Sequence, residues 1–88
     1  MSDTPTPDTR FNDFVYLQAQ NAGLFLGQLP NPATGETSVN LKAAATVLDS
    51  LEMLAVKTRG NLATEEAELL EKALLNIRAL YANVEDLA

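Results

Sequence analysis

The sequence predicts an all-α protein of three helices, in which the second and third form an antiparallel hairpin and the first packs across it. Three observations lead to this prediction. Apolar residues recur every three or four positions over three segments, helix-capping residues stand at the segment ends, and no run alternates apolar and polar residues as an amphipathic strand does. The 88-residue length fits one domain. A domain this small often completes its core by association, so we expect a homodimeric bundle.

A first helix is predicted from Phe11 to Leu26 by a stripe of apolar residues on one face. Its members share an arc of about 140° at 100° per residue, and they are Phe11, Phe14, Val15, Ala19, Ala22, Phe25 and Leu26. Gly27 follows as a residue that ends helices in the left-handed conformation. Residues 1–10 precede this helix and carry two prolines and no stripe, so we interpret them as a disordered tail before a folded domain of residues 11–88.

A second helix is predicted after a loop over residues 27–39 that two prolines stiffen. Asn40 is a good N-cap, and we expect the helix to run to about Arg59 and to end at Gly60. Its apolar residues cover an arc of about 220°, where a surface helix needs little more than about 100°. They are Leu41, Ala43, Ala44, Ala45, Val47, Leu48, Leu51, Leu54, Ala55 and Val56.

A third helix is predicted from a cap at Thr64 to about Val84. Glu65 and Glu66 stand in its first turn, where the helix dipole favours negative charge. Its apolar stripe contains Leu70, Ala73, Leu74, Ile77, Leu80, Tyr81 and Val84. The link before it is short, so the second and third helices are expected to form an antiparallel hairpin.

Three leucines lie outside the main stripes: Leu17, Leu24 and Leu75. With the wide arc of the second helix, they predict an apolar surface that meets another chain. Single exposed leucines are also common in monomeric proteins, so this interpretation competes with simple exposure. We select these three leucines as the candidate interface of a homo-oligomer, most simply a dimer.

Several polar residues fall on or beside apolar stripes and are candidates for burial. Glu52 lies inside the wide arc, and a buried carboxylate needs a partner. Arg59 on the same face and Arg78 on the third helix both qualify, within the chain or across an interface. Gln18 and Asn21 border the stripe of the first helix, where buried amides often set packing register.

The composition excludes several classes of function. The chain has no cysteine and no histidine, which removes thiol and imidazole chemistry and the usual zinc ligands. Its net charge is −6, which argues against binding nucleic acid or anionic membranes. No apolar run is long enough to span a bilayer, and the N-terminus lacks the apolar core of a signal peptide. We therefore expect a cytoplasmic protein with no metal and no cofactor.

These observations favour a non-enzymatic protein that acts through self-association or as an adaptor, in a process that the sequence does not name. The alternative is a carrier of a small ligand or peptide, with a groove between the first helix and the hairpin and Tyr16 or Tyr81 at its mouth. A third hypothesis is an enzyme that uses Asp49, Glu52 and Lys57. Nothing in the pattern of acidic residues favours it over a solvated helix surface.

The order of the segments resembles a family catalogued as domain of unknown function 1844. The matching stretches are Phe11-Asn12-Asp13-Phe14, Leu26-Gly27-Gln28-Leu29-Pro30-Asn31-Pro32 with Thr34-Gly35, Asn40-Leu41 with Ala44, Leu48-Asp49 with Leu51 and Leu54, Lys57-Thr58-Arg59-Gly60-Asn61-Leu62, Glu65-Glu66, Leu69-Leu70, and Arg78 with Tyr81. The resemblance implies a small helical bacterial protein and brings no activity and no site residue. Family members tend to carry threonine where this chain has Ala63, three residues before Glu66, which would complete a capping box.

Overall fold

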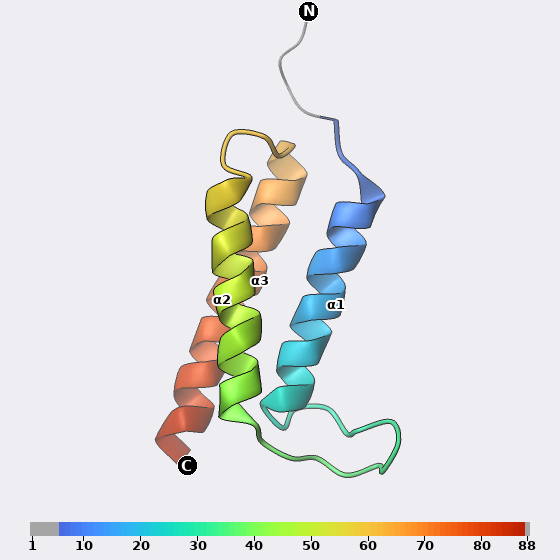
Figure 1. The fold of residues 1–88 in the computed structure, drawn as a ribbon, viewed down its shortest axis with the longest axis vertical. Helices are drawn as coiled ribbons and strands as arrows, with labels where there is room; N and C mark the ends of the chain where they lie inside the picture. Colours follow the sequence, from blue (N-terminus) through green and yellow to red (C-terminus); the bar gives the residue numbers. More distant parts are fainter. Residues whose placement is uncertain (1–5, 88) are drawn as a thin grey trace, which may run out of the picture.

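The structure, a computed structural model, describes residues 6–87 and contains the three expected helices. These are α1 (Thr9–Phe25), α2 (Leu41–Lys57) and α3 (Thr64–Leu87). They lie side by side along the long axis of the molecule, with a short α2–α3 link at one end and a long α1–α2 loop at the other (Figure 1). Each helix packs against both others. The predicted all-α fold and the antiparallel hairpin are confirmed.

The start of α1 lies two residues before the predicted one. Asp8 is the N-cap, and its carboxylate accepts a hydrogen bond from the backbone N–H of Arg10 at 2.9 Å. The predicted tail of residues 1–10 is therefore wrong for residues 8–10, which cap and begin the helix. The sequence analysis missed the cap because it followed the apolar stripe, and a cap lies outside the stripe. The first five residues of that predicted tail lie outside the part of the chain that the structure describes.

The end of α1 follows the prediction and turns the chain sharply. Gly27 has a φ of +76°, which is the left-handed conformation that a glycine adopts without strain. The N–H of Gly27 donates to the carbonyl of Leu24 at 3.2 Å, and that of Gln28 donates to Gly23 at 2.9 Å, which is the Schellman pattern. The loop then returns to the same end of the helix, where the Asn40 N–H donates to the Phe25 carbonyl.

The cap predicted for α2 is confirmed. The Asn40 side-chain oxygen accepts from the N–H of Ala43 at 3.0 Å. The far end differs by two residues, because α2 stops at Lys57 with Thr58 as its C-cap. Gly60 is left-handed as expected, with a φ of +83°, but it lies in the link beyond the cap instead of closing the helix.

The prediction of Thr64 as the cap of α3 is wrong, because Thr64 is already the first residue of the helix. Ala63 occupies the preceding position, and its carbonyl accepts the first helical hydrogen bond, from Ala67, at 3.0 Å. Alanine has no side-chain acceptor, so the capping depends on a residue from further along the helix. At its other end α3 continues to Leu87, beyond the predicted Val84.

The core runs between the three helices in two adjoining clusters. The larger contains Val15, Ala22, Val47, Leu51, Leu70, Ala73, Leu74 and Ile77, and the smaller contains Leu26, Ala44 and Val84 near the α1–α2 loop. Phe11 and Phe25 are partly buried against these clusters, as predicted. Phe14 is 46% exposed, so its predicted place in the packing is wrong. It sits one residue before the buried Val15, at the edge of the stripe.

Over residues 6–87, no helix combines the length and the apolar composition needed to cross a membrane.

Candidate functional site

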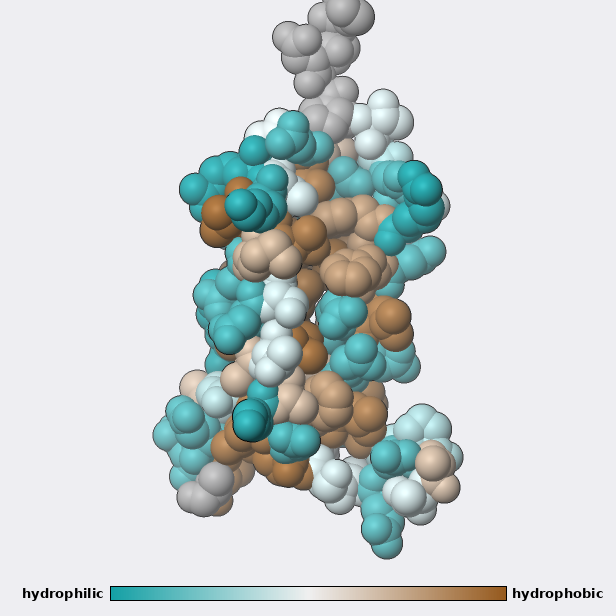
Figure 2. All heavy atoms as spheres, in the orientation of Figure 1, coloured by the Kyte–Doolittle hydropathy of each residue, from teal (hydrophilic) through white to brown (hydrophobic). Residues whose placement is uncertain are grey.

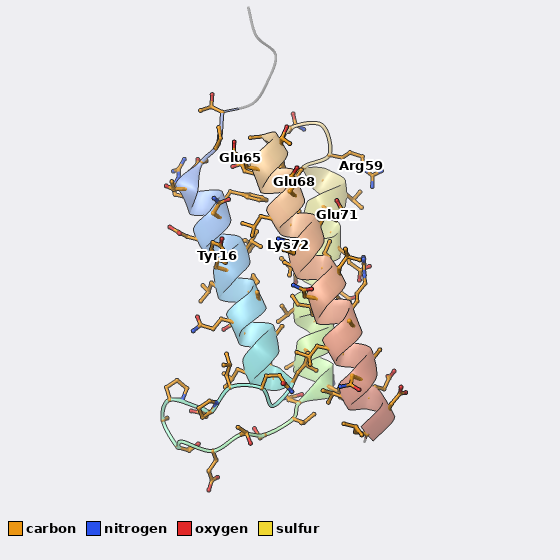
Figure 3. The ribbon with its side chains drawn as sticks, turned by 180° about the vertical axis from the view of Figure 1, so that it is seen from behind. Tyr16, Arg59, Glu65, Glu68, Glu71 and Lys72 are labelled. Carbon is orange, nitrogen blue, oxygen red and sulfur yellow. The ribbon has the colours of Figure 1, made fainter. Side chains whose placement is uncertain are left out.

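A groove of about 590 Å³ lies between α1 and α3. Its lining consists of Asn12 and Tyr16 from α1 and Glu65, Glu68, Leu69, Glu71, Lys72, Leu75 and Asn76 from α3. Figure 3 views this side of the molecule, with Tyr16 on one helix opposite the labelled glutamates and Lys72 on the other. We call it the acidic groove.

Helix periodicity explains why these side chains meet. Tyr16 follows the fully buried Val15, so it lies about 100° further round α1, on the side that faces α3. Asn12 precedes Tyr16 by one turn and shares its edge. On α3 the lining residues cover an arc of about 160° at 100° per residue, so the groove extends from the side of α3 that faces α1 over its outer face.

The apolar part of the acidic groove is unusually exposed for a small protein surface. Tyr16 is 60% exposed and Leu75 is 58% exposed. Between them, Leu69 is partly buried and packs against the core. The two exposed side chains therefore form an apolar surface that rests on a fixed core residue, which is the anatomy of a binding hollow.

The rim of the acidic groove carries three glutamates, Glu65, Glu68 and Glu71, against one lysine, Lys72, so its net charge is −2 (three negative, one positive). The ion pairs among the described residues are Asp8–Arg10 and Glu52–Arg78. The four charges at the rim are therefore unpaired within the part of the chain that the structure describes. In that same part, no three carboxylates lie where they could hold a metal ion.

One end of the acidic groove is fastened by Glu66, which is only 3% exposed. One carboxylate oxygen accepts the backbone N–H of Ala63 at 2.9 Å, and the other accepts the N–H of Asp8 at 2.8 Å. Glu66 thus supplies the glutamate half of a capping box while Ala63 supplies none. It also ties the start of α1 to the start of α3.

The sequence analysis placed Glu66 in the first turn for its effect on the helix dipole and did not identify this clamp. The signal that could have found it is the glutamate three residues after the capping position, which is where a capping-box carboxylate reaches back. The contact with Asp8 had no such signal, because it joins positions 58 residues apart.

The electrostatics next to this clamp lower the pKa of one carboxyl group. The side chain of Arg10 donates to both oxygens of Asp8, the shortest contact being 2.7 Å. This hydrogen bonding, followed by the bond from the Arg10 backbone N–H, lowers the pKa of Asp8 from 3.8 to about 2. Close by, the side-chain oxygen of Asn12 is buried and has no hydrogen-bond partner in the described chain.

A second outer surface lies on the α1–α2 side of the molecule and consists of Phe14, Leu17 and Met53. These three side chains, 46%, 52% and 54% exposed, form what we call the apolar patch. Phe14 and Tyr16 flank Val15 on opposite sides, so Phe14 points away from α3 and towards α2. In the space-filling view of this side, brown and tan atoms follow the seam between the helices, with teal atoms at the margins (Figure 2).

The helices spread the patch residues over about one and a half helical turns. The Asn40–Phe25 hydrogen bond places the last residue of α1 beside the residue that precedes α2. At about 1.5 Å per residue, Leu17, Phe14 and Met53 lie roughly 12, 16 and 20 Å from that end. Charged residues stand one helical turn from the patch residues: Asp13 precedes Leu17 by four positions, and Asp49 and Lys57 stand four positions on either side of Met53.

The three leucines predicted as an interface do not form one surface. Leu17 belongs to the apolar patch, and Leu75 belongs to the acidic groove. Leu24 is partly buried and lines a small hollow with Leu29, Pro30 and Pro32 of the α1–α2 loop. The sequence could not show that the loop folds back over Leu24.

Of the predicted buried polar residues, Glu52 and Arg78 come together and the others do not. The Arg78 guanidinium donates to the Glu52 carboxylate at 3.0 Å, with both side chains close to half exposed. Arg59 is exposed at the lip of an adjoining hollow between the α2–α3 link and α3, which shares Glu71 and Leu75 with the acidic groove. The prediction that Arg59 and Arg78 are buried is therefore wrong for the single chain. Gln18 and Asn21 are partly buried.

A comparison with known protein families identifies the family of this chain. The model of the family described as domain of unknown function (DUF1844) matches residues 8–83. The chain belongs to this family. No curated protein and no solved structure matches the chain at a significant level. The matched segment begins at the Asp8 cap and ends within α3, so it contains both the acidic groove and the apolar patch.

Proposed function

We propose that this protein is a non-enzymatic bacterial protein of the cytoplasm that acts through association, first as a homodimer formed at the apolar patch. The observation that carries the proposal is the exposure of three large apolar side chains, Phe14, Leu17 and Met53, on α1 and α2. Exposed apolar patches with polar edges mark association surfaces, and the charged residues beside this patch provide such an edge. The lack of cysteine in the chain fits a reducing compartment.

The three side chains of the patch supply part of the free energy that a dimer needs. Each of the three side chains is about half exposed, so burying the remainder contributes roughly 1 kcal/mol apiece. A two-fold axis doubles the number of side chains, for a total on the order of 6 kcal/mol. A dimer that forms at tens of micromolar needs a net free energy of roughly 6–7 kcal/mol after an association cost of about 4 kcal/mol or more, so the interface has to bury further surface around these three side chains.

Sedimentation equilibrium of the wild type and two matched variants tests this proposal. Leu17→Glu places a charge in the apolar patch, and Leu75→Glu makes the same change at an equally exposed leucine of the acidic groove. We expect a dimeric wild type, a monomeric Leu17→Glu variant and an unchanged Leu75→Glu variant. A wild type that is monomeric at tens of micromolar would overturn the proposal.

A second candidate function is a carrier of a peptide or small ligand, and the acidic groove is the observation that favours it. Tyr16 lies at the groove, as this hypothesis requires. Tyr81 does not, because it is partly buried against the smaller core cluster. The groove of about 590 Å³ falls within the range of ligand-binding hollows.

Absence of catalysis is part of the proposal, and the positions of the candidate groups support it. The enzyme hypothesis needs Asp49, Glu52 and Lys57 to converge. Asp49 and Lys57 are separated by about 12 Å along α2 at 1.5 Å per residue. Glu52 is engaged by Arg78. An acid–base pair needs hydrogen-bond reach of the reacting group, which this spacing does not provide.

A further inference from the structure

We propose that the acidic groove binds a basic amphipathic helix of a partner protein. This inference develops the carrier function proposed above and does not depend on dimer formation at the apolar patch. It rests on the shape of the groove, on its exposed apolar side chains and on its unpaired charges.

The dimensions of the groove suit a short helical segment. On α3 its lining extends from Glu65 to Asn76, which is about 16 Å at 1.5 Å per residue. A helix of about 11 residues covers that length. Its apolar positions at i, i+3, i+4 and i+7 would rest on Tyr16, Leu69 and Leu75.

A helix is a better occupant than an extended strand. The walls of the groove are two packed helices, and a third helix laid between them reproduces ordinary helix packing and forms a four-helix arrangement with α2. An extended peptide would need an open strand edge for its backbone hydrogen bonds. The described chain has helices as its only regular elements, and its one β-bridge, Leu26–Val39, belongs to the α1–α2 loop.

The charges of the groove determine the chemistry of the partner. Glu65, Glu68 and Glu71 recur at every third residue, so they advance around α3 by about 60° per step, and Glu71 reaches the side of α3 that faces the α2–α3 link. Lysine or arginine residues on the flanks of a docked helix would pair with these carboxylates, which no cation of the described chain engages. Complementary charge steers association and selects the partner, and salt weakens both effects.

The same charges disfavour the other occupants. A second copy of this chain brings a net charge of −6 and its own three rim glutamates, so like charges would meet across a symmetric contact. Nucleic acids and anionic lipid surfaces would meet the same repulsion.

The test measures the fluorescence anisotropy of labelled synthetic helices of about 14 residues, titrated with the full chain. The probe has leucines at i, i+3, i+4 and i+7 with lysines on its flanks. One control replaces the lysines with glutamates, and another contains the same residues in an order without helical periodicity. We expect the basic amphipathic probe to bind at tens of micromolar or tighter, and both controls to bind at least about fivefold more weakly.

Two sets of substitutions locate the binding surface. The first is Glu65→Gln, Glu68→Gln and Glu71→Gln together, and the second is Glu36→Gln, Glu85→Gln and Asp86→Asn together, which removes three exposed carboxylates elsewhere. The groove set should weaken probe binding at least about fivefold, and the control set by no more than about twofold. Circular dichroism checks that both remain helical, as expected for changes at exposed positions.

The other possible results each support or overturn the binding of a basic helix in the acidic groove. Failure of the basic probe to bind, equal binding of the acidic or unpatterned probe, or an equal effect of the two substitution sets overturns the inference. If Leu75→Glu dissociates a wild-type dimer, a second copy occupies the groove and the inference is wrong. Binding of the basic probe to monomeric Leu17→Glu supports it, and shows that it holds whether or not the apolar patch forms a dimer.

Discussion

The two outer surfaces of α1 join the same helix to different neighbours and are built from different chemistry. At the α1–α2 seam the helices are fastened at the loop end by backbone contacts, namely the Asn40–Phe25 hydrogen bond and the Leu26–Val39 bridge. At the α1–α3 seam the fastening is at the opposite end and depends on one buried carboxylate, Glu66. Each end of α1 is therefore held by a different helix.

The exposed surfaces over these two helix contacts also differ in their chemistry. The apolar patch over the α1–α2 seam has its charges at its edge, whereas the acidic groove over the α1–α3 seam is bordered by three glutamates. Exposed apolar area alone does not distinguish them, since Leu17 and Leu75 are almost equally exposed. The difference teaches that charge placement, more than apolar exposure, separates a surface suited to a second copy from one suited to a basic partner.

The largest expected effect comes from a residue that both seams share. Leu51 is fully buried in the larger core cluster, so Leu51→Ala should lower the free energy of unfolding by about 2–5 kcal/mol and loosen both seams together. Urea unfolding measures the change. Val56→Ala, on the same helix and 61% exposed, is the control and should change it by less than about 0.5 kcal/mol. Equal effects of the two would show that the described core is not the one that stabilises the protein.

Glu66→Ala should affect one seam only. It leaves the N–H groups of Asp8 and Ala63 without their acceptor and should lower the free energy of unfolding by about 1–3 kcal/mol. Amide hydrogen exchange should show lost protection at the start of α1 while the Phe25–Asn40 end keeps its protection. Glu65→Ala, at an exposed neighbouring position, serves as the control. Uniform loss along α1 would contradict the separate fastening of its two ends.

Two glycine substitutions compare the α1–α2 fastening with the α2–α3 link. Gly27→Val forces a β-branched residue into a left-handed conformation and places its Cβ 3.1 Å from the Val39 side chain, so we expect destabilisation of about 2 kcal/mol or more. Gly60→Val has the same backbone strain with open space around the Cβ, and should be destabilised by about 1 kcal/mol. Thermal or urea unfolding of the two variants measures the difference. A larger effect at Gly60 would show that the loop does not pack against α1 as described.

The smallest expected effect is a pH-dependent loosening of the N-cap of α1. The pKa of Asp8 is lowered to about 2 in the folded chain by the Arg10 hydrogen bonds. A lowered pKa means that the cap stabilises the fold at pH values above 3.8 and that this contribution is lost as pH falls from 3.8 towards 2. Carboxyl carbon chemical shifts followed by NMR should place the Asp8 titration near 2, and Arg10→Ala should return it towards 3.8. Amides beside the apolar patch should not respond to this titration.

The sequence by itself determined the features that depend on neighbouring residues. The apolar stripes identified all three helices, Asn40 marked the start of α2, and Gly27 marked the end of α1, because helix periodicity and capping act within a few residues of the chain. Tyr16 could be placed at a groove for the same reason, since its offset from Val15 follows from the turn of one helix. The family resemblance also rested on local motifs, and the match over residues 8–83 confirmed it.

Only the tertiary structure decided which residues from different helices meet. Glu52 had Arg59 and Arg78 as possible partners, and the register of α2 against α3 selected Arg78. Leu24 lines a hollow together with Leu29, Pro30 and Pro32, because the α1–α2 loop packs beside it. Glu66 became a buried clamp through a contact 58 residues distant, which no local pattern encodes. In each case the physical reason is that burial and pairing depend on where a second element lies, and that position is set by the packing of the whole core.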